Sequence, residues 1–351
     1  MSFSSFITFL FGFVINLKYN EIYYVFEKEH LVKEKRVEIN LGRLCNLECQ
    51  FCMSSSTHKG RDNRLECLDN AMDELRELYS PGAYVNFLGG EPTAHREITQ
   101  LIDAAQKLGY KRISLCTNGI LSADMNRARE LVEAGLTRVT LSVHSHSPDV
   151  EDGLTHRKGA FHLKEQAVRN YVALHQEYST INPPALNTVV HKKNYKHLRE
   201  FLSYFNKLGV REFRLNALRP EGRGRSQGAR AYFVRYTTAA PHMLAAVLES
   251  WAKGVRVSCG GFPPCIWPSQ VHMRDDVLGR LWADHTEVSR VVSEYSPGLG
   301  TERFSWDEMR SQSLKTKTPD CPKCSYNAKC EGVWVSYASI HGLKEFVPVV
   351  L

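Results

Sequence analysis

Residues 36–52, RVEINLGRLCNLECQFC, join a strand pattern to three closely spaced cysteines. Apolar and polar residues alternate from Arg36 to Leu41, which predicts a β-strand. Cys45, Cys49 and Cys52 follow in a CxxxCxxC spacing, without a nearby histidine to complete a zinc site. Three thiolates on one loop indicate an incomplete iron–sulfur site, in which one iron stays open to another molecule. The structural alternative is three buried or disulfide-bonded cysteines.

The same strand begins a series of six strand–helix units. The expected strands are Arg36–Leu41, Tyr84–Leu88, Arg112–Cys116, Arg138–Val143, Ala185–Val190 and Glu212–Asn216. The expected helices are Leu68–Leu78, Glu97–Leu108, Met125–Ala134, Phe161–Tyr178 and Tyr195–Leu208. Because crossovers between parallel strands are right-handed, these units predict an α/β fold, a partial (β/α)6 TIM-like barrel.

Polar and reactive residues follow four consecutive strands of this series. They are Cys45, Cys49 and Cys52 after the first strand, Gly89, Gly90 and Glu91 after the second, Thr117 and Asn118 after the third, and His144 after the fourth. Parallel barrels carry their chemistry at the carboxyl ends of the strands. The sequence therefore predicts the functional site at that edge.

Composition and charge narrow the class of protein. The chain has 351 residues, 43% of them hydrophobic, and a net charge of +7. It is long enough for one barrel-sized domain or two medium ones, and its balanced charge excludes a disordered chain. The charge is mild for nucleic-acid binding, so we expect no nucleic-acid partner. Ten cysteines in so large a chain do not indicate a secreted disulfide scaffold, which favours a reducing cytoplasm.

Residues 1–35 form an apolar N-terminal extension. Its run from Phe3 to Leu17 is interrupted by Gly12 and is shorter than the roughly 18 to 20 residues that a membrane span needs. It has no signal-peptide pattern. We expect an element packed against the domain. The alternative is a weak membrane-surface anchor assisted by the lysines that follow.

The chain changes character after Asn216. The segment 219–235, RPEGRGRSQGARAYFVR, predicts a linker or an active-site loop, followed by a helix at about Ala239–Trp251 and a short strand at Val255–Ser258. The remainder contains CGGFPPCIWP at 259–268 and CPKCSYNAKCEGVW at 321–334, and is otherwise irregular. So little apolar periodicity predicts that a metal centre stabilises this region, and CxxC pairs suit zinc as well as iron–sulfur clusters.

CNLECQFC at 45–52 and LGGEP at 88–92 resemble the radical S-adenosylmethionine (SAM) superfamily, and the resemblance covers about residues 36–218. It implies that Cys45, Cys49 and Cys52 hold a 4Fe-4S cluster whose open iron binds SAM. It also implies that SAM is reductively cleaved to a 5'-deoxyadenosyl radical.

The resemblance also implies roles for residues around the cluster. Gly89, Gly90 and Glu91 would meet the methionine amino group, and Phe51 would pack near the adenine. The residues alone support the first role, because glycines allow close approach and a carboxylate accepts from an ammonium. Candidates for contacts to the SAM carboxylate or ribose are Thr117, Asn118 and Ser142, with a plain turn as the alternative. Candidates for adenosine or substrate binding are Asn187 and Asn216.

The carboxyl-terminal cysteines resemble a SPASM or twitch auxiliary-cluster domain, here residues 219–351. The resemblance implies one auxiliary 4Fe-4S cluster on Cys265, Cys321, Cys324 and Cys330. Cys259 is spare or replaces Cys265, and a structural zinc on the same cysteines is the alternative. Cys67 and Cys116 are expected to be core thiols.

The expected function is therefore that of an oxidoreductase-type radical SAM enzyme acting on a peptide or small metabolite, with a flavodoxin- or ferredoxin-type electron donor. The alternatives are a nucleoside, sugar or lipid modifier, or a non-catalytic Fe-S or zinc redox or scaffold protein. His144 and His146 are candidates for acid, base or substrate contact, or are structural. Arg219, Arg223 and Arg225 are candidates for binding an anionic substrate group, or belong to a solvated loop.

Overall fold

The computed structural model describes residues 8–10, 13–15, 35–53, 68–282, 289–296 and 300–351. The chain divides into two compact units, Met1–Val32 and Lys33–Leu351. The described part of the first unit is an antiparallel pair, β1 (Thr8–Leu10) and β2 (Phe13–Ile15). The expected packing or membrane contact of Phe3–Leu17 lies largely outside the described residues. Within the described ranges, no helix combines the length and hydropathy that crossing a bilayer requires.

The second unit is built on one nine-stranded sheet with the order β11-β10-β3-β4-β5-β6-β7-β8-β9. From β3 to β9 the strands pair in parallel and in chain order, as the right-handed crossovers predict. The strands are β3 (Lys35–Asn40), β4 (Tyr84–Leu88), β5 (Arg112–Thr117), β6 (Arg138–Ser142), β7 (Ala185–Val190), β8 (Glu212–Ala217), β9 (Arg256–Gly260), β10 (Ser289–Ser296) and β11 (Gly300–Ser305). The predicted α/β partial barrel is confirmed.

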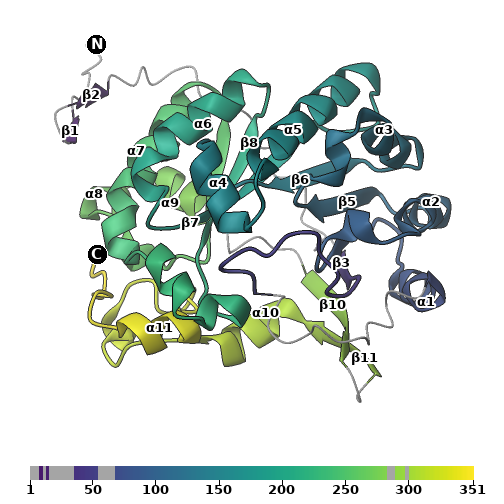
Figure 1. Cartoon of the computed structure of the whole chain (residues 1–351). Helices are drawn as coiled ribbons and strands as arrows, with labels where there is room; N and C mark the ends of the chain where they lie inside the picture. Colours follow the sequence, from purple (N-terminus) through teal and green to yellow (C-terminus); the bar gives the residue numbers. More distant parts are fainter. Residues whose placement is uncertain (1–7, 11–12, 16–34, 54–67, 283–288, 297–299) are drawn as a thin grey trace, which may run out of the picture. The chain divides into compact units, whose positions relative to one another are not determined.

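Helices connect these strands and lie outside the curved sheet (Figure 1). They are α1 (Leu68–Leu78), α2 (Ile98–Leu108), α3 (Met125–Glu133), α4 (Pro148–Thr155), α5 (Ala160–Glu177), α6 (Leu198–Lys207) and α7 (Tyr236–Ala252). Shorter helices follow at α8 (Ser269–His272), α9 (Asp275–Leu281), α10 (Trp306–Met309) and α11 (Val335–His341). The six predicted strands and the helices between them are confirmed to within a few residues.

The sheet extends further than the sequence predicts. The short strand expected near Val255 is β9 and continues the sheet beside β8, whereas β10 pairs with β3 at the opposite end and β11 pairs with β10. A buried carboxylate anchors this hairpin, because Glu74 of α1 accepts hydrogen bonds from Ser293 Oγ at 2.7 Å and Arg303 Nε at 2.9 Å. The expectation of irregular structure is wrong for this hairpin, because distant α1 and β3 hold it.

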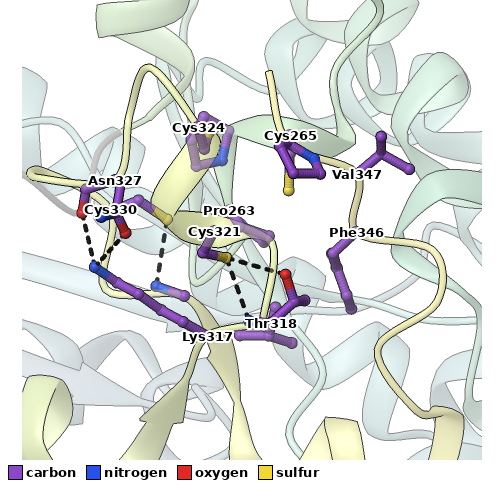
Figure 2. Close-up of a pocket in the computed structure, with 14 residues that line it drawn as sticks. Pro263, Cys265, Lys317, Thr318, Cys321, Cys324, Asn327, Cys330, Phe346 and Val347 are labelled. Atoms are coloured by element: carbon purple, nitrogen blue, oxygen red, sulfur yellow. Dashed lines mark hydrogen bonds between the residues drawn. The ribbon is translucent and has the colours of Figure 1, made fainter. Parts of the chain in front are cut away.

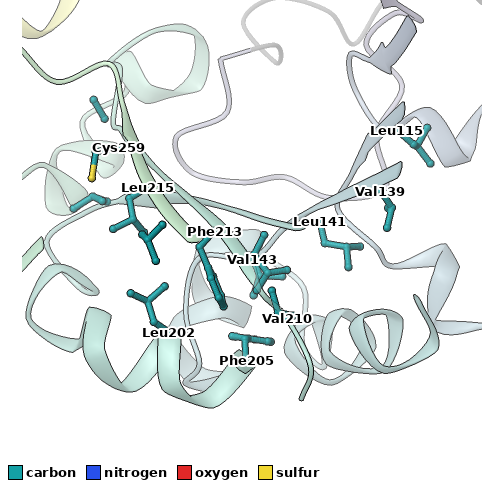
Figure 3. Packing of buried hydrophobic residues seen from close by; sticks show 14 of the residues in the cluster. Leu115, Val139, Leu141, Val143, Leu202, Phe205, Val210, Phe213, Leu215 and Cys259 are labelled. Atoms are coloured by element: carbon teal, nitrogen blue, oxygen red, sulfur yellow. The ribbon is translucent and has the colours of Figure 1, made fainter. Parts of the chain in front are cut away.

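The two faces of the sheet differ in polarity. Alternate residues such as Leu141, Phe213 and Leu215 are buried against the helices in one continuous core (Figure 3). The intervening positions carry polar side chains that remain partly exposed, among them Glu38, Asn40, Ser142, Asn187 and Asn216. This alternation gives the curved sheet an apolar outer face and a polar inner face.

The carboxyl-terminal region packs on the first turn of α7. Tyr236 stacks on Tyr337 of α11 with ring centroids 3.9 Å apart, and Tyr236 N donates to Tyr337 Oη at 3.1 Å. A two-stranded sheet, β12 (Lys315–Thr316) with β13 (Val333–Trp334), frames the last three cysteines. Strands from before and after residue 218 belong to the same large sheet. The predicted division into a barrel domain, 36–218, and an auxiliary-cluster domain, 219–351, therefore stays a proposal about function.

Candidate functional site

The first cysteine loop directly follows β3 and is held by backbone hydrogen bonds from two directions. Leu44 O accepts from Glu91 N at 2.7 Å, which ties the loop to the end of β4. On the other side, Glu48 N and Gln50 N donate to the last carbonyls of α4, those of Thr155 and Leu154, at 3.2 and 3.0 Å. The loop therefore sits at the carboxyl edge of the parallel strands, where the sequence predicts the site.

Gly89 and Gly90 allow this loop to approach the end of β4. Both have positive φ, +90° and +46°. A Cβ on Gly89 would lie 1.7 Å from Asn40 Oδ1, and a Cβ on Gly90 would lie 2.2 Å from Leu44 O. The glycines are required for the backbone itself, whatever they contact in a ligand.

Glu91 joins the ends of β4 and β5. Its buried carboxylate accepts hydrogen bonds from Thr93 N at 3.0 Å, from the Thr117 hydroxyl and from Asn118 N at 2.6 Å. Asn118 then donates from Nδ2 to Asn46 Oδ1 at 2.7 Å, with Cys45 Sγ at 3.8 Å. The three predicted motifs meet at one place, and the contact expected between Glu91 and a methionine amino group remains a prediction.

The thiols of this loop are electrostatically suited to a cationic group. Burial raises the pKa of Cys45, and it raises the pKa of Cys49 to about 12. A thiolate at Cys49 therefore needs a compensating positive charge, which iron would supply. Cys45 and Cys49, with this requirement, fit the cluster that the CxxxCxxC spacing predicts.

Phe51 lies in an aromatic group at the same edge. Its ring centroid is 5.2 Å from that of His144, 5.8 Å from that of His191 and 6.2 Å from that of Tyr232. Burial lowers the pKa of His144 well below its usual value and lowers that of His191 to about 3, so both imidazoles are neutral. The sequence interpretation missed His191, although it directly follows β7 as His144 follows β6.

His146 lies elsewhere, beside Tyr204 with ring centroids 6.3 Å apart. Asn187 and Asn216 hydrogen-bond to each other on the inner face of the sheet. Ser142, a predicted SAM contact, uses its backbone carbonyl to accept from Lys164 Nζ at 2.9 Å, and Lys164 also contacts Glu151 Oε1 at 2.6 Å. The sequence interpretation did not identify this buried ion pair, whose members lie 13 residues apart.

The Gly- and Arg-rich segment 219–235 packs on the first cysteine loop. Arg223 N donates to Cys52 O at 3.0 Å, and a Cβ on Gly222 would lie 2.6 Å from the same oxygen. Arg219 is already engaged, since it pairs with Glu221 and its guanidinium lies 4.0 Å from the Trp334 ring centroid. The Arg219 side chain is therefore only 10% exposed and the segment packs on the cysteine loop, whereas a role in binding an anionic substrate group stays a prediction.

The four predicted carboxyl-terminal cysteines come together at a second site (Figure 2). Cys265, Cys321, Cys324 and Cys330 line one pocket with Pro263, Pro264, Lys317, Thr318, Asn327, Gly332, Val333, Phe346, Val347 and Pro348. Burial, together with the nearby Cys330, Cys324 and Cys321, raises the pKa of Cys265 to about 12. A cationic group would therefore be needed to hold these thiols as thiolates.

Hydrogen-bond donors point at three of these sulfurs. Thr318 N lies 3.2 Å from Cys321 Sγ, Gly332 N lies 3.3 Å from Cys330 Sγ, and Val349 N lies 3.4 Å from Cys324 Sγ. Backbone N–H groups of this kind stabilise thiolates that ligate iron–sulfur clusters. Among the described residues, no three His, Cys, Asp or Glu side chains are grouped as one metal ion would need.

Of the remaining cysteines, the structure describes Cys259 and Cys116. Cys259 is on β9, 1% exposed, in the hydrophobic core beside Leu215 (Figure 3). The structure therefore separates it from Cys265, which lines the pocket. Cys116 lies on β5, where burial raises its pKa to about 11. Cys67 lies outside the described residues.

Solved structures share this fold. Streptococcus suis SuiB bound to precursor peptide SuiA superposes with a TM-score of 0.57 at 13% identity, covering 90% of this chain and 75% of SuiB. Native anSMEcpe with bound AdoMet superposes with a TM-score of 0.58 at 18% identity, covering 89% and 95%. At such identities the likeness shows the fold.

Sequence relatives match the barrel. The probable GTP 3',8-cyclase of Saccharolobus solfataricus is 30% identical over 190 residues, which is 54% of this chain and 58% of that protein. The matched region thus spans little more than half of the relative. Residues 39–205 match the family described as Radical SAM superfamily, and they contain the cysteine loop, the GGE turn and Asn118. Residues 39–205 of this chain therefore belong to the radical SAM superfamily.

Proposed function

We propose that this enzyme reductively cleaves SAM and abstracts a hydrogen atom from a peptide or a small metabolite, with a carboxyl-terminal SPASM- or twitch-like auxiliary cluster assisting oxidation. One observation carries the proposal. Cys265, Cys321, Cys324 and Cys330 line a single pocket, in the same compact unit as the CxxxCxxC loop. The cluster at Cys45, Cys49 and Cys52, when bound, supplies the electron that cleaves the sulfonium bond of SAM.

The residues around the first site would hold the cysteine loop and bind SAM. Gly89 and Gly90 admit the loop backbone, and Glu91 fixes the turn that carries Thr117 and Asn118. We assign Phe51, Gly89, Gly90, Glu91, Thr117, Asn118 and Ser142 to the SAM pocket. The buried aromatic group around Phe51 would exclude water from a bound adenine, because His144 and His191 are neutral there.

The residues of the second site would hold four thiolates in a low-dielectric pocket. The N–H groups of Thr318, Gly332 and Val349 offset part of their negative charge. Four thiolates complete the ligation of one 4Fe-4S cluster, and such a cluster would accept the electron that a substrate radical loses on oxidation. A structural zinc at the same cysteines is the competing assignment.

Two observations bear on the substrate. The superposition on SuiB covers 90% of this chain, and SuiB was solved with its precursor peptide SuiA bound. This similarity favours a peptide as the substrate. The sequence similarity to probable GTP 3',8-cyclases favours a nucleotide as the second candidate. We further propose a flavodoxin- or ferredoxin-type electron donor and a reducing cytoplasmic location, since a chain of 351 residues does not need its ten cysteines for a disulfide scaffold.

Metal analysis and SAM cleavage test this function. Anaerobically reconstituted protein is expected to contain about eight irons and eight sulfides, from two 4Fe-4S clusters. With dithionite and SAM it is expected to produce 5'-deoxyadenosine. Replacing Cys45, Cys49 and Cys52 by Ala should abolish this product, whereas replacing Cys321 and Cys324 should remove about four irons and leave SAM cleavage.

Two outcomes would contradict the proposal. A content of about four irons and one zinc would show that the second site holds zinc instead of an auxiliary cluster. An intact first cluster that yields no 5'-deoxyadenosine with peptide or nucleotide candidates would favour a non-catalytic redox or scaffold protein.

A further inference from the structure

A buried ion pair joins the two helices that contact the first cysteine loop. The side chains of Lys164 on α5 and Glu151 on α4 are 1% and 0% exposed, and Lys164 Nζ lies 2.6 Å from Glu151 Oε1. Burying two charges costs several kcal/mol per ion unless every partner is well placed. Such a pair in the middle of a site therefore needs an explanation beyond stability.

The pair is fully hydrogen-bonded to the end of β6. Lys164 Nζ also donates to Ser142 O at 2.9 Å. The second carboxylate oxygen, Glu151 Oε2, accepts from His144 N at 2.8 Å and from Ser145 N at 2.7 Å. Lys164 and Glu151 therefore fix the turn between β6 and α4, along with the orientation of α4.

The orientation of α4 determines where the cysteine loop lies. Thr155 O and Leu154 O, at the end of this helix, accept from Glu48 N and Gln50 N, which flank Cys49. Thr155 Oγ1 in turn donates to Glu151 O at 2.9 Å. A chain of hydrogen bonds thus connects the ion pair to the backbone on both sides of Cys49.

Cys49 also lies against α5 itself. Leu47, Ile120 and Ala160 form a small apolar cluster, and Cys49 packs on it together with Leu163. Leu163 precedes Lys164 on α5, and α4, which carries Glu151, holds Glu48 and Gln50 on either side of Cys49. Both buried charges are therefore on the two helices that contact this part of the loop.

We propose that Lys164 and Glu151 are positioning residues that hold the cysteine loop and, through their charges, tune the reduction potential of the cluster at Cys49. This inference rests on the proposed function, because it takes Cys49 as a cluster ligand. Loss of the positive charge should make the cluster harder to reduce, and loss of the negative charge should make it easier to reduce.

The experiment compares Lys164→Met, Glu151→Gln and the double variant with wild type. EPR-monitored redox titration of the reconstituted protein should give a more negative potential for Lys164→Met, a more positive one for Glu151→Gln and an intermediate one for the double variant. Arg169→Met is the matched control, because Arg169 is half-exposed on the same helix α5 and pairs with Glu165. Its potential should stay at the wild-type value.

A second measurement needs no cluster. Hydrogen exchange of the cluster-free protein should be faster at the amides of Glu48 and Gln50 in both single variants than in wild type and in Arg169→Met.

Exchange at the wild-type rate in both variants, or reduction potentials that shift in the same direction, would overturn the inference. A wild-type protein that assembles no cluster at Cys45, Cys49 and Cys52 would instead contradict the proposed function, and hydrogen exchange would still test the positioning role. The neutral double variant keeps the test available if a single variant does not fold.

Discussion

Arg223 N donates a hydrogen bond to Cys52 O at 3.0 Å, which joins the loop after β8 to the cysteine loop after β3. The adjacent Gly222, at a φ of +55°, lies against the same carbonyl and against Met53 O. Arg219 of this loop stacks on Trp334, two residues beyond Gly332, whose amide contacts Cys330. One short segment therefore contacts the first cysteine site and also β13, the strand that directly follows Gly332 of the second.

Gly222→Val should displace this segment from the first site. A Cβ there would lie 2.4 Å from Met53 O, and valine does not tolerate the positive φ. We expect the iron content of the first site to fall severalfold, with a loss of about 1–3 kcal/mol in unfolding free energy. Iron analysis and denaturant titration measure these effects. Gly228→Ala, with its nearest neighbour at 3.5 Å, should behave as wild type, and equal iron in both variants would refute the contact.

Gly90→Ala should disturb the same site from the opposite side. The new methyl group would lie 2.2 Å from Leu44 O, next to Cys45. We expect cluster assembly to fail at this site while the auxiliary iron remains, which EPR of the reconstituted protein can distinguish. Gly153→Ala is a suitable control because a Cβ on this residue of α4 meets nothing within 4 Å, and alanine should stabilise the helix slightly.

Cys265→Ala and Cys259→Ala should separate the two candidates for the auxiliary ligand. Cys265 lines the pocket with Cys321, Cys324 and Cys330, whereas Cys259 is buried in the apolar core. Cys265→Ala is expected to lose about four irons, and Cys259→Ala to keep the full complement. The reverse pattern in iron and sulfide analysis would assign Cys259 as the ligand.

Stability should fall as the pH is lowered below about 6.5, the usual histidine pKa in an unfolded chain. Burial depresses the pKa of His191 to about 3 in the folded state, so between these values the unfolded chain binds more protons. His191 therefore lowers the free energy of unfolding by up to about 1.4 kcal/mol for each pH unit below 6.5. The pKa of His144 is also lowered by burial, so His144 acts in the same direction.

Urea unfolding at pH 7, 6 and 5 measures this slope. His191→Leu should reduce it, whereas His162→Gln, at an exposed position on α5, should leave it unchanged. A slope that His191→Leu does not alter would show that the pKa of His191 is the same in the folded and unfolded states, against the depression that burial predicts.

The strand–helix repeat, the cysteine loop and the GGE turn could be predicted from the amino-acid sequence, because these features depend on local patterns. Alternation and helical periodicity located six strands to within about a residue, and the CxxxCxxC spacing is a property of one loop. The chemistry expected at the carboxyl edge followed from the parallel topology alone.

Tertiary structure decided what depends on distant neighbours. The separation of Cys265 from Cys259, six residues apart in the sequence, arises because β9 carries Cys259 into the core before the chain turns at Pro263 and Pro264 toward the pocket. The attachment of β10 and β11 depends on Glu74 of α1. The Lys164–Glu151 pair and the contact of Arg223 with Cys52 likewise join segments that no local pattern connects, because buried charges and backbone groups find partners across the fold.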